Sequence, residues 1–86
     1  MGRVSCFELS GKLLWFHSLD HSPPHFHAKK AGEWEYRVFF LLARDSMLEC
    51  KWQFKAISRK DAEALLDLSG RFRLELLEEW ELKVQS

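Results

Sequence analysis

Apolar and polar residues alternate along the middle of the chain. Phe26 and Ala28 take one side of the first such stretch, and His25 and His27 take the other. The same period of two runs through two further stretches, whose apolar sets are Trp34, Tyr36, Val38, Phe40 and Leu42, and then Leu48, Cys50, Trp52 and Phe54. This period is typical of antiparallel strands with one buried face. Two earlier strands are predicted at residues 4–9 and 12–17, joined by a Ser10-Gly11 turn.

The period changes after Ser58. Apolar or small residues then recur at steps of three and four, at Ala62, Leu65, Leu66, Ser69, Phe72, Leu76, Leu77 and Trp80. This pattern predicts an amphipathic helix, with Ser58 as the N-cap and Asp61 in a capping-box position. The stripe stays in phase across Gly70, so we expect one long helix over residues 58–83 and not two helices broken at Gly70.

These elements predict an α+β fold. An antiparallel sheet of about five strands, a β-meander over residues 1–56, carries one long C-terminal helix on its apolar face. The 86 residues make a single domain, 1–86, and a composition of 47% hydrophobic and 14% aromatic residues suffices for a real core.

The parity of the core positions predicts the register of the central hairpin. If Phe26 and Tyr36 share the core face, an odd number of residues lies between their strands. A loop at residues 30–32, with Gly32 in the left-handed conformation, meets this need.

This register places His27 opposite Glu35 and His25 opposite Arg37. Both imidazoles are then expected on an open, polar face of the sheet, away from the core and in solvent.

Charge is balanced overall but unevenly spread. Residues 1–60 carry ten Lys/Arg against six Asp/Glu, a balance of +4, and residues 61–86 carry three against seven, a balance of −4. A globally basic nucleic-acid-binding protein is therefore disfavoured. We expect a homodimer, because four apolar residues lie off the predicted core surfaces and suggest a contact between subunits: Phe39, Leu41, Leu68 and Leu74.

The N-terminal residues contain no apolar run like that of a signal peptide, and no segment is long and apolar enough to span a bilayer. We therefore expect a cytoplasmic protein with no membrane partner.

The stretch LDHSPPHFHAKK, residues 19–30, holds three of the four histidines. Pro23 and Pro24 set their own backbone angles and deliver the chain stiffly to His25. Three interpretations of this stretch stay open at this point.

The first interpretation is a metal site. His25 and His27 on one strand reach a single ion, and His21 or Glu35 completes the set, while Asp20 orients an imidazole from outside. Zinc or another divalent transition metal is the expected cofactor.

The second interpretation is acid–base chemistry. His25 and His27 exchange protons near neutral pH, and Arg37 or Lys51 holds the phosphate of a phosphodiester. The sequence identifies no nucleophile beside them, so whether the protein is an enzyme stays open, with a non-enzymatic role favoured.

The third interpretation is a turn without further chemistry. Asp20 accepts backbone hydrogen bonds, the prolines set the bend, and the imidazoles pair with Glu35 or stack on aromatic rings.

The run from Asp20 to Ala28, D-H-S-P-P-H-F-H-A, closely resembles the signature D-H-x-P-P-H-F-H of a small bacterial family, domain-of-unknown-function family 4160. The motif L-L-E-E-W, from Leu76 to Trp80, is similar to the closing helical motif of that family. The resemblance therefore spans essentially the whole chain. It implies the setting of a small mobile or toxin–antitoxin-like operon and a regulatory or partner-binding role, with a small protein partner from the same operon.

The chain departs from the family pattern in two places. Its central strands, RVFFLLA and CKWQFKA, are unusually apolar, and residues 56–58 replace the usual Pro before the helix. Taken together, the sequence favours a non-enzymatic binding module whose open sheet face presents Asp20, His21, His25, His27, Glu35 and Arg37.

Overall fold

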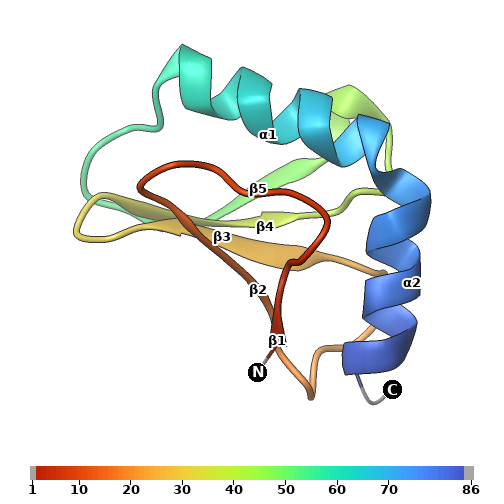
Figure 1. The fold of residues 1–86 in the computed structure, drawn as a ribbon. Coiled ribbons are helices and arrows are strands. Elements are labelled where there is room, and N and C mark those ends of the chain that lie inside the picture. Colours follow the sequence, from red (N-terminus) through yellow and green to blue (C-terminus); the bar gives the residue numbers. More distant parts are fainter. Residues whose placement is uncertain (1, 85–86) are drawn as a thin grey trace.

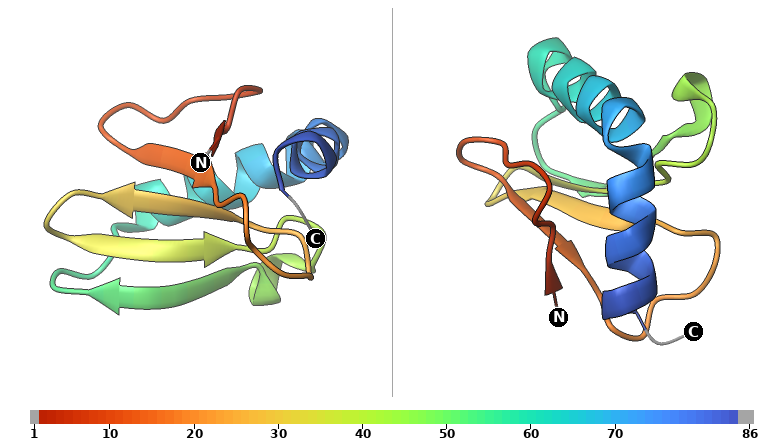
Figure 2. Two further views of the ribbon diagram at one scale, coloured as in Figure 1. Left: turned by 90° about the horizontal axis from the view of Figure 1, so that it is seen from below. Right: turned by 45° about the vertical axis from the view of Figure 1, so that its right-hand side comes forward.

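The computed structural model describes residues 2–84, which form a five-stranded antiparallel sheet and two α-helices. The strands pair in chain order (Figure 2), as β1 (Gly2–Arg3), β2 (Leu13–Phe16), β3 (Phe26–Lys30), β4 (Trp34–Val38) and β5 (Leu48–Gln53). A short 3-10 helix, η1 (Arg44–Ser46), precedes β5, and α1 (Arg59–Arg71) and α2 (Arg73–Lys83) end the chain. Figure 1 shows α1 running above the sheet and α2 descending beside it. The predicted α+β fold is confirmed.

One face of the sheet and both helices share a single apolar core. The alternation around Phe26 is confirmed, because Phe26 and Ala28 are fully buried. The helix stripe is confirmed as well, since Leu65, Leu76 and Trp80 are buried in the same cluster. Burial of these large side chains is the main favourable contribution to folding.

The prediction of one long helix is wrong. The chain leaves helical geometry at Phe72, with φ −103° and ψ 27°, and Gly70 lies inside α1. An unbroken helix over residues 58–83 would be about 39 Å long at 1.5 Å per residue. The molecule measures only 32 Å along its longest axis, so the bend keeps both halves of the stripe on the core. No helix within residues 2–84 is long and apolar enough to cross a membrane.

The start of the helix agrees with the prediction. Ser58 is the N-cap of α1, and its Oγ accepts a hydrogen bond from the backbone N–H of Asp61 at 3.1 Å. The Asp61 carboxylate pairs with Lys12 at 3.0 Å. Burial alone would raise the pKa of Asp61, but the Lys12 ammonium and the Ser58 hydroxyl outweigh it, so this pKa lies below its usual value.

The first predicted strand is also wrong. Only Gly2–Arg3 forms strand β1, and residues 4–12 cross to β2 as a loop. Val4 and Phe7 are both buried although they are three residues apart, a spacing that does not put two side chains on one face of a strand. The Ser10-Gly11 turn is confirmed, with Gly11 at φ 76°.

The register of the central hairpin differs from the prediction by one position. Gly32 has φ 76°, as expected, but Lys30 pairs with Trp34, so the three-residue loop is 31–33 and not 30–32. His27 therefore lies opposite Arg37 and not Glu35. The predicted pairing of His25 with Arg37 is wrong too, because β3 begins only after His25.

A β-bulge alters the pairing of β4 with β5. The register shifts between Glu35 and Tyr36, so Trp52 lies opposite Glu35. The extra residue turns Trp52 out of the core face where alternation had placed it, and 38% of this residue is exposed.

Glu79 ties α2 to the segment after β1. Its carboxylate accepts the backbone N–H groups of Ser5 at 2.7 Å and Cys6 at 2.9 Å, and the ammonium of Lys83 at 2.6 Å. We call Glu79, Lys83 and the two backbone N–H groups the Glu79 clamp.

Candidate functional site

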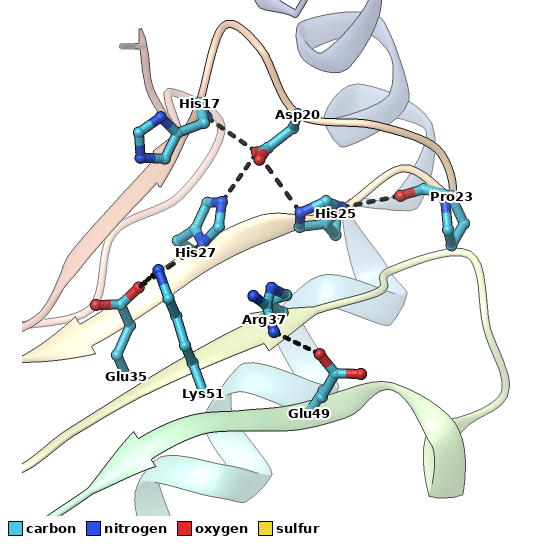
Figure 3. Close-up of polar contacts among 9 residues, drawn as sticks. All are labelled: His17, Asp20, Pro23, His25, His27, Glu35, Arg37, Glu49 and Lys51. Carbon is cyan, nitrogen blue, oxygen red and sulfur yellow. Dashed lines mark hydrogen bonds and ion pairs between the residues drawn. The ribbon is translucent and has the colours of Figure 1, made fainter. Parts of the chain in front are cut away.

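The histidine-rich segment folds back beside β3 and brings Asp20 against it. One oxygen, Asp20 Oδ2, accepts a hydrogen bond from His27 Nε2 at 2.9 Å and from the backbone N–H of His17 at 3.2 Å. His25 Nε2 lies 3.6 Å from the same oxygen. Figure 3 shows Asp20 between the three histidines. We call Asp20, His25 and His27 the Asp20 cluster.

His25 lies just before β3, at the end of the sheet. Its ring packs against Phe39 and Trp80, with centroid distances of 5.0 and 5.6 Å. Its Nδ1 lies 2.9 Å from the carbonyl oxygen of Pro23. A carbonyl only accepts, so Nδ1 carries a proton, and Nε2 of the neutral ring presents a lone pair to Asp20.

His27 points to the face of the sheet opposite the helices. Its ring stacks on Trp15 of β2 at 5.1 Å with an interplanar angle of 22°. Burial lowers the pKa of this imidazole, and the hydrogen bond and charge of Asp20 offset that effect only in part. With the Nε2 proton donated to Asp20, Nδ1 of the neutral ring has no hydrogen-bond partner among the described residues and is buried.

The expected exposure of the two imidazoles is wrong. Phe26 points inward as predicted, but His25 is only 6% exposed and His27 only 3%. Trp15 pairs directly beside His27 across the β2–β3 ladder and stacks on it, and Asp20 closes over both rings from the segment between the strands. The polar face of the sheet is therefore covered at this end.

The Asp20 cluster has the composition and spacing of a metal site. One atom of each side chain, a carboxylate oxygen or an imidazole nitrogen, lies within 4.8 Å of the other two. Two imidazoles with one carboxylate are donors that iron, zinc, copper and nickel accept. In the neutral form of His25 with its proton on Nδ1, an ion there would accept the lone pair of Nε2.

Glu35 is close to this cluster without belonging to it. Its Oε2 lies 3.9 Å from His27 Nδ1 and 3.3 Å from the Lys51 ammonium. Its Oε1 accepts a hydrogen bond from the Trp52 indole at 3.3 Å.

The other predicted residues are not drawn into the cluster. Arg37 lies opposite His27, but its guanidinium donates to Glu49 at 2.6 Å. His21 is exposed and is not part of the metal-ligand group found within residues 2–84.

Two neighbours of the site were not predicted from the sequence. Trp15 forms the platform under His27, and the exposed ring of His17 meets His27 edge to face at 5.2 Å. The spacing of His17 and Asp20, three residues apart, is a signal for the local turn in which the carboxylate accepts the His17 N–H. Trp15 carries no comparable local signal, because its contact with His27 depends on strand register.

Comparison with known proteins places the chain in a family. Residues 11–81 match the model of the family described as Domain of unknown function (DUF4160), and the chain belongs to that family. No curated protein and no solved structure is significantly similar to the chain.

Proposed function

We propose that this member of the DUF4160 family is a non-enzymatic binding module built around a transition-metal site. Asp20 Oδ2, His25 Nε2 and His27 Nε2 are the ligand atoms, and zinc is the expected ion. The convergence of one donor atom from each of the three residues within 4.8 Å carries the proposal.

The spacing of the donor atoms supports this assignment. Ligands about 2.0 Å from a tetrahedral zinc ion stand about 3.3 Å from each other. The distances from Asp20 Oδ2 to the two imidazole nitrogens are 2.9 and 3.6 Å, on either side of that value. A bound ion would draw the three donor atoms, which lie within 4.8 Å of one another, toward this spacing.

The protonation pattern supports it as well. A metal needs an unprotonated nitrogen, and the Pro23 carbonyl already holds the His25 proton on Nδ1, so that Nε2 is ready to bind. The lowered pKa of His27, caused chiefly by burial, keeps its ring neutral at cellular pH.

The alternative, cleavage of a phosphodiester, has less support. Both reactive Nε2 atoms face Asp20, and the guanidinium of Arg37 is paired with Glu49. Lys51 is paired with Glu35. The groups that would hold and protonate a phosphate are thus engaged with carboxylates.

The regulatory role follows from the position of the ligands. A bound ion would fasten the segment that carries Asp20 to the start of β3, giving a partner-binding surface with a loaded and an unloaded form. The small partner protein of the same operon and the homodimer are parts of this proposal that rest on the family resemblance and on exposed apolar residues such as Leu74 and Leu41.

Metal analysis and titration calorimetry test the proposal. Protein purified without an affinity tag, stripped with EDTA and titrated with zinc is expected to bind one equivalent. His25→Ala plus His27→Ala should abolish binding, and His21→Ala, which removes an exposed imidazole of the same segment, should leave it unchanged.

Asp20→Asn serves as a second variant of nearly equal volume, in case the double substitution prevents folding. Substoichiometric binding by the wild-type protein, or binding that survives both changes, would refute the metal site.

A further inference from the structure

A buried nitrogen beside the cluster lacks a partner. His27 Nδ1 has no hydrogen bond within residues 2–84, although it is fully shielded from solvent. The nearest carboxylate oxygen, Glu35 Oε2, stands 3.9 Å away, just beyond hydrogen-bond distance. An unpaired buried nitrogen is costly, and a proton on Nδ1 would let Glu35 Oε2 accept a hydrogen bond from it.

Glu35 itself is held by two residues of β5. It is only 7% exposed, and its two oxygens contact Lys51 and Trp52 of β5 at 3.3 Å each. The bulge between Glu35 and Tyr36 brings both β5 residues to the same carboxylate. Figure 3 shows the Lys51 side chain rising from β5, so that its ammonium lies beside the Glu35 carboxylate.

Binding of a metal ion would change the hydrogen-bonding role of His27 Nδ1 from acceptor to donor. Without metal, the single proton of the neutral His27 ring sits on Nε2 and is donated to Asp20. A metal ion on Nε2 displaces that proton, and the neutral ring then carries its proton on Nδ1. Histidine ligands commonly donate this second N–H to a carboxylate. No net proton is gained or lost by His27, because the proton moves from one ring nitrogen to the other through solvent.

We infer that Glu35 is the positioning residue for His27, and that it couples occupancy of the metal site to the outer strand β5. This inference rests on the proposed metal site. On loading, Glu35 Oε2 closes on the new Nδ1–H and loosens its contacts with Lys51 and Trp52. The exposed side of β5 thereby differs between the loaded and the unloaded protein.

Two matched variants test this assignment. Glu35→Gln keeps the side-chain shape but removes the charge, and should weaken zinc binding about tenfold or more with one equivalent still bound. Glu49→Gln removes the carboxylate that pairs with Arg37 on the same face, and should change the zinc affinity less than twofold. Both proteins are first shown to be folded by circular dichroism.

Nuclear magnetic resonance gives a readout that a merely structural role would not move. In the wild-type protein, zinc should convert His27 from the Nε2–H to the Nδ1–H form and shift the Trp52 indole N–H resonance. In Glu35→Gln the Trp52 shift should be lost, and in Glu49→Gln it should persist.

The outcomes separate this inference from the metal site. Equal zinc affinity in the wild-type protein and in Glu35→Gln, or a Trp52 resonance unmoved by zinc in the wild-type protein, would refute the role of Glu35 and leave the metal site standing. A wild-type protein that binds no zinc would overturn both.

Discussion

Two partly buried carboxylates each tie neighbouring segments together, and their sets of hydrogen-bond partners differ. Glu79 reaches residues 73 and 74 positions away, whereas the hydrogen-bond partners of Asp20 lie within seven positions of it. Glu79 receives two backbone N–H groups and the Lys83 ammonium at 2.6 to 2.9 Å. Asp20 receives one backbone N–H and the His27 ring, while His25 Nε2 lies 3.6 Å from it, beyond hydrogen-bond distance.

The difference indicates which carboxylate is structural. In the Glu79 clamp every donor has its acceptor within the chain, which is the usual state of buried polar groups. Around the Asp20 cluster, His25 Nε2 lies beyond hydrogen-bond distance of Asp20, and His27 Nδ1 has no partner within residues 2–84. This incomplete set of partners supports the proposed metal site.

The pKa shifts of Glu79 and of its neighbour Cys6 agree with a structural role for the Glu79 carboxylate. Burial alone would raise the pKa of Glu79, but the hydrogen bonds from Lys83 and the two backbone N–H groups outweigh it and lower the pKa. Burial, with the neighbouring Glu79 carboxylate, raises the pKa of the Cys6 thiol to about 12, so this cysteine stays protonated.

The largest expected effect is on stability. Glu79→Ala leaves two backbone N–H groups and an ammonium without their acceptor, and should lower the free energy of unfolding by about 3 kcal/mol. Asp20→Ala in the EDTA-treated protein should cost only about 1 kcal/mol, because it removes a less complete set of hydrogen bonds. Urea denaturation measures both.

Glu81→Ala is the control for the first variant. It removes an exposed carboxylate from the same helix and should change stability by less than about 0.5 kcal/mol. An equal or larger loss for Asp20→Ala than for Glu79→Ala would contradict the distinction between the two centres.

Zinc should sharpen the contrast. At a free concentration of about 100 times Kd, an ion that binds only the folded protein stabilises it by about 2.7 kcal/mol. The wild-type protein and Glu79→Ala should gain this amount in thermal denaturation with zinc, and Asp20→Ala should gain none. A similar gain in all three proteins would mean that zinc binds elsewhere.

The contribution of the Glu79 clamp to stability should decrease as the pH falls. The lowered pKa of Glu79 means that the unfolded chain binds more protons at this carboxyl than the folded protein does, from about pH 4.3 downward. The stabilisation is therefore present above that pH and is lost as the pH falls through the folded value. The stability difference between wild type and Glu79→Gln should shrink between pH 6 and pH 3, and a constant difference would contradict it.

The local patterns predicted most of the fold. Alternation around Phe26 and the helix stripe through Leu65 and Trp80 report on which side each residue faces, and that is a local property of each element. The hairpin register was missed because a three-residue loop with left-handed Gly32 is possible at 30–32 or at 31–33, and parity is the same in both. The break at Phe72 was missed because the stripe continues in phase, and only the size of the molecule requires a bend.

The sequence predicted which residues gather near the Asp20 cluster better than it predicted how they are arranged. Asp20, His25 and His27, which the structure brings together, are among the predicted residues, as is the neighbouring Glu35, but the burial of the two imidazoles was not predicted. Burial depends on Trp15 lying beside His27 and on Asp20 folding over both rings, and these contacts join strands and loops whose pairing the sequence pattern leaves undetermined. The β-bulge that turns Trp52 toward Glu35 has no local signal either.

The smallest expected effect, a change in zinc affinity, tests whether the proposed metal site has three protein ligands or four. His17→Ala removes an exposed ring that lies 5.2 Å from the His27 ring, but it keeps the backbone N–H that Asp20 accepts. Zinc affinity should therefore fall less than about threefold, below 1 kcal/mol. A fall of tenfold or more, about 1.4 kcal/mol, would make His17 a fourth ligand that swings in from the surface. The site would then be a closed structural centre of three imidazoles and one carboxylate, as fully satisfied as the Glu79 clamp, and the contrast between the two carboxylates would hold only for the metal-free protein.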